Sequence, residues 1–218
     1  GKKKPIVVMK AGRTSAGQSA AGSHTAALAT NDTAVDALFA QCGVIRGKTL
    51  EEFLALATGL SNQRLPSGRR IGILTNSGGP GVLCADSCAA EGLMVPELSK
   101  KTQSALASFL PPTAALNNPV DVIGFASEDQ HARAVATMLK ADEIDALIIV
   151  HVSVRAKDND PVAAGILRGI SAARQTDINR KPVYLCWMAE GDLDRAFTVD
   201  GEVIPTYRYP EVPARIIS

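Results

Sequence analysis

Short apolar runs alternate along this chain with longer stretches in which apolar residues recur at helical spacing. Residues 146–154 form the clearest run and are rich in β-branched residues, which predicts a buried strand. Residues 127–141 have the spacing of a helix with one apolar face. Extended to the whole chain, this pattern predicts strands at 4–9, 44–46, 70–75, 93–96, 146–154, 182–188 and 203–205. It predicts helices at 25–41, 49–61, 82–91, 100–109, 127–141, 161–175, from about 192, and at 209–217.

Strands that alternate with helices predict right-handed βαβ units and parallel sheets. The segment 62–69 contains Pro66-Ser67-Gly68 and is the best internal boundary. We therefore predict an α/β fold with two three-layer units, at 1–65 and 69–218. The second is nearly complete and flavodoxin-like, whereas the first is incomplete, because its opening strand begins almost at residue 1. That position suggests a fragment.

Composition supports this fold class and narrows the partners. The chain has 218 residues, 46% hydrophobic and only 4% aromatic, so its core must be built from Val, Ile, Leu and Ala. Such a composition suits parallel sheets covered by helices. The formal net charge is +1, which provides no basic field for nucleic acid. No apolar run approaches the ~20 residues of a membrane span, and no signal peptide is visible, so a membrane partner is not predicted either.

The four cysteines are Cys42, Cys84, Cys88 and Cys186. Cys84 and Cys88 lie one turn apart on a predicted helix, a spacing unsuited to an ordinary disulfide. No further Cys or His pair at ligand spacing completes a metal site. We predict no metal, buried apolar roles for this pair, reduced thiols and a cytoplasmic location.

Two glycine-rich turns, at residues 22–28 and 76–83, are each placed between a predicted strand and a predicted helix. A helix N-terminus carries about half a positive charge and several unpaired N–H groups, so it attracts anions. In parallel sheets, ligands bind beyond the carboxyl ends of the strands. We predict that the two helix starts face each other and hold a phosphate. The predicted phosphate-binding residues are Gly22, Ser23, Thr25 and Ala26 in the first turn, and Asn76, Ser77, Gly78, Gly79 and Gly81 in the second.

His24 stands at the mouth of the first turn, after a predicted loop at 10–23. A histidine that is phosphorylated during turnover needs an exposed, orientable imidazole and donors for the phosphoryl oxygens. The segment offers both, although a structural or solvated histidine explains the residues alone equally well. His131 and His151, on a predicted helix and a strand end, are predicted to be structural. There is no P-loop, no convincing dinucleotide fingerprint and no Gly-x-Ser-x-Gly.

Longer motifs carry a resemblance to a known family. They are Lys10-Ala-Gly-Arg13-Thr-Ser-Ala-Gly17 with Ser23-His24-Thr25-Ala26-Ala27-Leu28-Ala29, then Thr75-Asn76-Ser77-Gly78-Gly79-Pro80-Gly81, then Asn118-Pro119-Val120-Asp121. In this order they resemble two successive segments of the NDP-forming acyl-CoA synthetases, relatives of succinyl-CoA synthetase. The first of the two is the phosphohistidine segment. The resemblance covers residues 4–210, and it implies succinyl-CoA synthetase-like units.

The resemblance also implies a reaction, in which acid, CoA and ATP give acyl-CoA, ADP and phosphate, reversibly. His24 would be the catalytic phosphoryl carrier, between the helices that follow His24 and Gly81. Lys10 and Arg13 are candidates for anion contacts, with a solvated strand end as an equal alternative. Besides phosphate, the implied cofactors are CoA and ATP or ADP with Mg²⁺, bound mainly by domains absent from this chain.

The absent parts are a CoA-binding domain and an ATP-grasp domain, which the resemblance places in the same or a partner chain. Because they are missing, the isolated fragment is not expected to catalyse the full reaction. The small-molecule partner would be a carboxylic acid or its acyl-CoA, and a homo-oligomer is left open.

Two alternatives belong to other functional classes. Some members of the family are fused to an acetyltransferase domain, have lost the histidine, and use this region as a regulatory sensor of acyl-CoA or phosphate. The presence of His24 argues against that role here. The other alternative is a scaffold or interface domain with a vestigial site.

Overall fold

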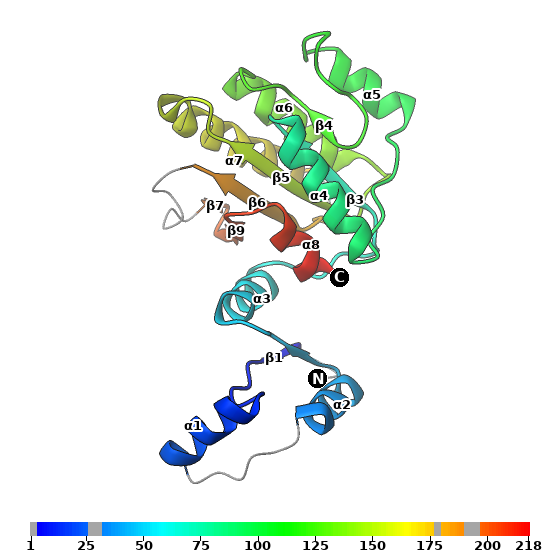
Figure 1. The fold of residues 1–218 in the computed structure, drawn as a ribbon. Coiled ribbons are helices and arrows are strands. Elements are labelled where there is room, and N and C mark those ends of the chain that lie inside the picture. Colours follow the sequence, from blue (N-terminus) through cyan, green and yellow to red (C-terminus); the bar gives the residue numbers. More distant parts are fainter. Residues whose placement is uncertain (1–3, 26–31, 177–179, 190–196) are drawn as a thin grey trace. The chain divides into compact units, whose positions relative to one another are not determined.

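The computed structural model describes residues 4–25, 32–176, 180–189 and 197–218 (Figure 1). The chain divides into two compact units, Gly1–Leu60 and Ser61–Ser218. This division falls inside helix α3 (Leu50–Asn62), slightly before the boundary segment that the sequence indicated. Within the described ranges, no helix is both long enough and apolar enough to cross a bilayer.

The first unit contains one parallel pair of strands, β1 (Ile6–Val8) and β2 (Val44–Arg46). Helices α1 (Ser15–Thr25) and α2 (Asp32–Cys42) connect them, and α3 begins after β2. Thr49 caps α3, because its hydroxyl accepts a hydrogen bond from the backbone N–H of Glu52 at 3.1 Å. Little of this unit is buried, since α2 has no buried residue and α3 buries only Leu56 and Gly59.

The second unit is built on a sheet of five parallel strands. The strands are β3 (Ile71–Thr75), β4 (Val120–Asp121), β5 (Ala146–Val152), β6 (Val183–Met188) and β9 (Thr206–Tyr207). Their order across the sheet is β4-β3-β5-β6-β9, which is the flavodoxin order when the strands are counted along the chain. The predicted α/β class with parallel sheets is confirmed.

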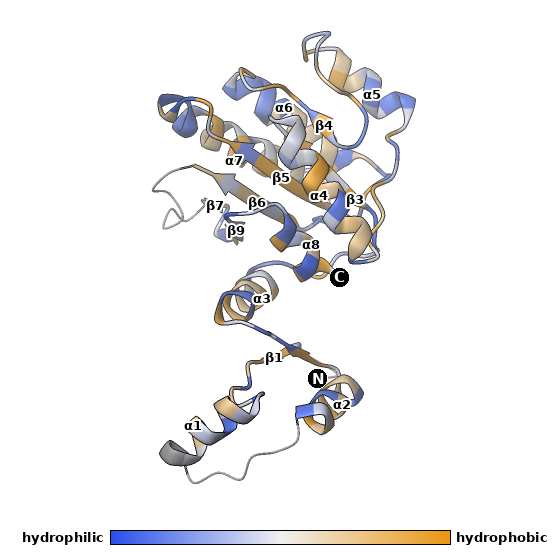
Figure 2. Cartoon of the chain, in the orientation of Figure 1, coloured by the Kyte–Doolittle hydropathy of each residue, from blue (hydrophilic) through white to orange (hydrophobic). Residues whose placement is uncertain are grey.

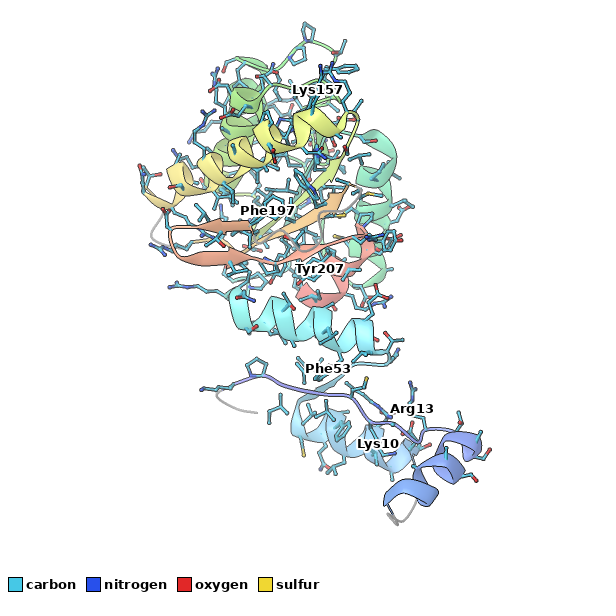
Figure 3. The ribbon with its side chains drawn as sticks, turned by 90° about the vertical axis from the view of Figure 1, so that its left-hand side faces the viewer. Lys10, Arg13, Phe53, Lys157, Phe197 and Tyr207 are labelled. Carbon is cyan, nitrogen blue, oxygen red and sulfur yellow. The ribbon has the colours of Figure 1, made fainter. Side chains whose placement is uncertain are left out.

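Helices cover both faces of this sheet (Figures 1 and 3). They are α4 (Gly78–Ala90), α5 (Lys100–Ala107), α6 (Glu128–Lys140), α7 (Asn159–Arg174) and α8 (Glu211–Ile217), with a single 3₁₀ turn, η1 (Ala156–Asp158), before α7. Helices α6 and α7 pack together, and α4 packs against α8 and β3. The interior strand β5 is coloured hydrophobic over most of its length in Figure 2. Its first six residues are fully buried, which accounts for the β-branched run in the sequence.

Two glycines let α6 and α7 approach closely. A Cβ placed on Gly165 would lie 2.4 Å from the carbonyl oxygen of Glu128, and one on Gly169 would lie 2.4 Å from that of Ala132. Real Cβ atoms do not approach a backbone oxygen so closely, so the spacing of this helix pair depends on both glycines.

The start of α6 is fixed by its own sequence. Ser127 accepts a hydrogen bond from the N–H of Gln130, and the Gln130 side chain accepts one from the N–H of Ser127, at 3.2 and 2.8 Å. This reciprocal capping box explains why the predicted start of α6 is confirmed. Ser99 is the N-cap of α5, and the predicted start of that helix at residue 100 is confirmed.

The side chain of Asn118 pairs with the part of β3 that β4 does not reach. Its side-chain Oδ1 accepts a hydrogen bond from the N–H of Ile73 at 2.9 Å, and its Nδ2 donates to the carbonyl of Ile71 at 2.8 Å. These are the backbone groups that a neighbouring strand would otherwise pair with. The family-like motif at 118–121 therefore serves first to finish the sheet.

Several sequence-based expectations differ from the structure. The predicted strand at 93–96 is only an isolated bridge between Arg70 and Met94. The edge strand at 203–205 is part of an antiparallel hairpin, β7 (Phe197–Val199) with β8 (Glu202–Ile204), and β7 and β9 were not predicted. Strands of two or three residues are too short to show a period-2 pattern. The helix predicted from about 192 begins in residues outside the described ranges.

Candidate functional site

Thr75 is the last residue of β3 and lies at the carboxyl edge of the second unit's sheet. The next residue, Asn76, is only 6% exposed. Its Nδ2 donates to the carbonyl of Val152 at 2.9 Å, and its Oδ1 accepts from the N–H of Val152 at 2.8 Å. Asn76 therefore ties the end of β3 to the end of β5. Its side-chain amide is occupied, so the predicted phosphate contact of Asn76 would have to use the backbone.

The turn between β3 and α4 is held by its own hydrogen bonds. The hydroxyl of Thr75 accepts from the N–H of Ser77 at 3.0 Å and donates to the carbonyl of Ser77 at 2.9 Å. Ser77 is the N-cap of α4 with an extended backbone, and its side chain makes no capping bond. Helix α4 begins four residues earlier than predicted, because the glycines that the sequence assigned to the turn are already helical.

The first turn of α4 offers two open donors, the N–H groups of Gly78 and Gly79. Both residues are exposed, and a helix leaves its first N–H groups without a partner inside the helix. Pro80 has no N–H, and that of Gly81 already donates to the carbonyl of Ser77 at 3.2 Å. A Cβ on Gly79 would have no heavy atom within 4 Å, so there is room for a ligand above this turn.

Gly81 has a packing role. It is buried, and a Cβ at this position would lie 2.9 Å from the Cγ2 of Thr75. Glycine thus lets α4 pack directly on the end of β3. Its amide and its surface are both used, so in this turn the geometry favours Gly78 and Gly79 over Gly81 as phosphate ligands.

Two of the three histidines in the sequence are buried near this edge. His131 and His151 are each 4% exposed, and burial lowers the pKa of both, that of His151 to about 4. The Nδ1 of His131 lies 3.0 Å from the carbonyl of Ser127. His151 stacks on Trp187 with ring centroids 4.2 Å apart, and its Nε2 lies 3.3 Å from Oδ1 of Asn159. Both are neutral packing residues, as predicted.

His151 also contributes to a cavity that was not predicted from the sequence. Together with Asn76, Phe125 and the starts of α6 and α7, it lines a cavity of about 150 Å³ at the carboxyl edge. A strand-end position was the only signal in the sequence, and it did not indicate a cavity.

A cluster of charged side chains lies in the first unit, around Asp32 at the start of α2. Arg46 Nη2 is 2.6 Å from Asp32 Oδ1, Lys10 Nζ is 3.4 Å from the same oxygen, and Arg13 Nε is 3.4 Å from Oδ2. Arg46 also pairs with Asp36. The hydrogen bond from Arg46 is the largest reason why the pKa of Asp32 is lowered.

This cluster lies beyond the carboxyl ends of the strand pair. Val8, the last residue of β1, is in register with Arg46, the last residue of β2. Figure 3 labels Lys10 and Arg13, which follow β1. Three cations share two carboxylates, so the cluster keeps one surplus positive charge. The carboxylate of Asp32 thus holds the two candidate anion contacts, Lys10 and Arg13, close together.

The sequence-based expectation of a loop at 10–23 followed by a helix from Thr25 is wrong. Helix α1 covers Ser15–Thr25, and Thr14 opens it by accepting a hydrogen bond from the N–H of Gly17 at 3.2 Å. Intrinsic propensity does not account for this helix, since the segment has only three alanines against two glycines and three serines. His24 therefore lies in the last turn of a helix. Ala26 lies outside the described residues, and the roles of Gly22, Ser23, Thr25 and His24 stay predictions.

Taken together, the five parallel strands in flavodoxin order and the glycine-rich helix start at their carboxyl edge define the second unit as a flavodoxin-like α/β domain. Comparison with protein families then identifies the chain. Residues 1–60 match the succinyl-CoA ligase like flavodoxin domain, and residues 71–216 match the Ligase-CoA domain. The chain belongs to this CoA-ligase family, which confirms the resemblance carried by the motifs.

Relatives and solved structures agree with this assignment. The chain is 39% identical over 213 residues to the acetate–CoA ligase [ADP-forming] II subunit alpha of Pyrococcus furiosus, covering 96% of this chain and 46% of that protein. It is 31% identical over 216 residues to the 4-hydroxybutyrate–CoA ligase [ADP-forming] of Nitrosopumilus maritimus, covering 99% and 30%.

Among solved structures, the dinucleotide-forming acetyl-coenzyme A synthetase 1 of Ca. Korarchaeum cryptofilum, in complex with phosphate and ADP, superimposes with a TM-score of 0.85. Its sequence is 30% identical, and the match covers 98% of this chain and 46% of that one. The chain therefore spans less than half the length of each of these three proteins.

Proposed function

We propose that this chain is the phosphohistidine-bearing part of an ADP-forming acyl-CoA synthetase. Family membership supports the reaction class. The observation that carries the assignment to one residue is the burial of the other two histidines, each 4% exposed. An imidazole that exchanges a phosphoryl group with an outside nucleotide must be reachable. His24 is the remaining histidine of the sequence, and it lies in the motif that resembles the family's phosphohistidine segment.

The proposed relay has three steps. Acyl-CoA and phosphate exchange to give acyl phosphate and CoA. A nitrogen of His24 then attacks the phosphorus, the P–O bond to the acyl oxygen breaks, and the carboxylic acid leaves. Finally a terminal phosphate oxygen of ADP attacks the phosphohistidine, so that ATP forms and the imidazole is regenerated. All steps are reversible, and the reverse direction makes acyl-CoA.

The described residues suit the phosphoryl group in this scheme. Each unit by itself offers groups of the kind that stabilises phosphoryl oxygens: the open N–H groups of Gly78 and Gly79 in the second, and the surplus positive charge around Asp32 in the first. We assign CoA, the nucleotide and its Mg²⁺ to CoA-binding and ATP-grasp domains in the same or a partner chain. The relatives reported above are named as ligases, so they favour this enzyme over the regulatory alternative.

The test is to incubate the full-length parent protein with ATP labelled at its γ-phosphate. We expect an acid-labile, base-stable label that maps to His24 and is discharged by ADP. His24→Asn should abolish the label. Ser19→Ala, which changes an exposed residue of the same helix, should retain it. A label that survives His24→Asn, or no label in a parent that binds ATP, would overturn the proposal.

A further inference from the structure

A cavity of about 550 Å³ opens at the amino edge of the second unit's sheet. Arg70, Asp145 and Pro182 lie in its lining, and each immediately precedes the first residue of a strand, β3, β5 or β6. Because these strands are parallel, all three residues lie at the same edge. It is the opposite edge from Asn76 and the start of α4. The cavity is therefore separate from the candidate site in this unit.

Positive charge is concentrated in this cavity. Its lining contains the five cations Arg64, Arg70, Lys140, Arg180 and Lys181, against the two carboxylates Asp142 and Asp145. That is a surplus of three positive charges, in a chain whose formal net charge is only +1. A concave surface with one sign of charge concentrates ligands of the other sign.

Two of the five cations bond to other groups of the cavity lining. Arg70 forms an ion pair with Asp145, with Nη2 to Oδ1 at 2.7 Å and Nε to Oδ2 at 3.1 Å. Lys181 donates from Nζ to the carbonyl of Leu139 at 2.9 Å and also to that of Ala141. These carbonyls end α6, whose C-terminus carries a partial negative charge. The ammonium group of Lys181 offsets this partial negative charge, so the end of α6 does not repel an anion in the cavity.

The other three cations are available for a ligand. Arg64, Lys140 and Arg180 are exposed, and among the ion pairs of the described residues none involves them. They come from the segment before β3, the end of α6 and the segment before β6. Three cations that approach from separate elements can surround one anionic group.

The cavity also has an apolar part. Leu139 and Ile144 are 3% and 1% exposed, and Leu65 is 68% exposed. A volume of this size falls within the range of small-molecule sites, roughly 300–1,000 Å³. A ligand with several negative charges and a flat or apolar body matches both features.

We propose that this cavity is a second ligand site, for a nucleotide-sized phosphorylated molecule whose phosphates bind Arg64, Lys140 and Arg180. Binding at this site does not involve His24, so the proposal does not depend on the phosphoryl relay. Nucleoside diphosphates and the nucleotide portion of CoA both belong to this ligand class.

The test is to titrate the 218-residue chain, without other subunits, with ADP, CoA and pyrophosphate by calorimetry. We expect ADP or CoA to bind and pyrophosphate to compete, with affinity falling as salt is raised. The double variant Arg64→Glu/Arg180→Glu should bind at least tenfold more weakly. Lys157→Glu, the same kind of charge change at an exposed position near the opposite edge of the sheet, should bind as the unaltered chain does, and so should His24→Asn.

A second measurement does not depend on variants. Chemical acetylation should be slowed at Lys140 by ADP or CoA and remain unchanged at Lys157. Pyrophosphate that competes while adenosine does not would assign recognition to the phosphates. The proposal is wrong if no ligand binds at millimolar concentration, if Lys157→Glu weakens binding as much as the double variant, or if only His24→Asn abolishes it.

Discussion

The two units of the chain hold themselves together by different means. The second encloses a continuous apolar core, in which side chains such as Leu147 and Leu185 are completely buried. The described part of the first buries a single large apolar side chain, Leu56, and is linked by the ion pairs around Asp32. Packing gives the second unit a fixed frame for the donors of α4. The first unit carries the proposed phosphohistidine with little core of its own.

The largest effect should come from disturbing the packing of the second unit. Gly169→Ala places a methyl group 2.4 Å from the Ala132 carbonyl, so α6 and α7 must separate. We expect a loss of about 3 kcal/mol in the free energy of unfolding, measured with urea. Gly79→Ala is the matched control, because a Cβ there meets nothing within 4 Å and its stability should be unchanged or higher. Equal losses would contradict the packing argument.

A somewhat smaller loss should follow Asn76→Ala. This change removes two hydrogen bonds to the backbone of Val152, and it leaves that N–H and carbonyl without their partner. We expect about 2 kcal/mol of destabilisation in the same urea experiment. Ser77→Ala should cost little, because the Ser77 side chain makes no capping bond. If Asn76→Ala were neutral for stability and abolished only phosphoryl transfer, Asn76 would be a ligand of the phosphate.

The acid stability of the second unit should depend on Glu143. Burial raises the pKa of this carboxyl, but hydrogen bonds from Ser99 and Thr102 outweigh it and hold the pKa at about 2. The folded state thus binds the proton less readily than the unfolded chain. The stabilisation is complete above the ordinary glutamate range and is lost as the pH falls toward 2.

Glu143→Gln should therefore cost about 1 kcal/mol at pH 7, since solvent screens a partly exposed group. The cost should shrink as the pH is lowered through that range, which thermal melts between pH 2 and 7 would show. Glu97→Gln, for which no such hydrogen bonds occur among the described residues, is the control. A pH profile unchanged by Glu143→Gln would refute the assignment.

The smallest effect is expected in the first unit, from Asp32→Asn. The change removes the carboxylate that gathers Lys10, Arg13 and Arg46, and surface ion pairs contribute little each. We expect faster hydrogen exchange in α2 and no change in β5, and raising the salt should reproduce the effect in the unaltered chain. Asp86→Asn, at an exposed position of α4, should change neither region. Unaltered exchange in α2 would show that the ion pairs do not hold this unit.

The sequence was most informative where a local pattern alone decides the structure. Buried parallel strands such as β5 leave a long apolar run, and the caps Ser99 and Ser127 fix their helices through bonds only three residues away. The sequence located the glycine turn at 76–81, but it did not show which glycines pack and which are open to a ligand. Whether Gly81 packs or Gly79 binds depends on Thr75 across the turn, and this is tertiary information.

The errors have two origins. The first is local: the segment before His24 was predicted as a loop from its glycines and serines, whereas it forms a helix that the hydroxyl of Thr14 opens. The gathering of Lys10 and Arg13 by Asp32 joins residues about twenty positions apart, and no spacing rule indicates it. The cavity at the amino edge is assembled from four separate segments, so it could not be predicted from any one of them.

The side chain of Asn118 has a consequence for solubility. Strand β4 pairs only with Leu74 and Thr75, so on this side the first half of β3 has no neighbouring strand, although β5 pairs with β3 on the other side. The amide of Asn118 occupies Ile71 and Ile73 instead. An open row of strand N–H and carbonyl groups invites pairing with another chain, and sheets that expose one tend to aggregate. The amide of Asn118 thus occupies the groups through which this part of β3 would otherwise pair with another chain.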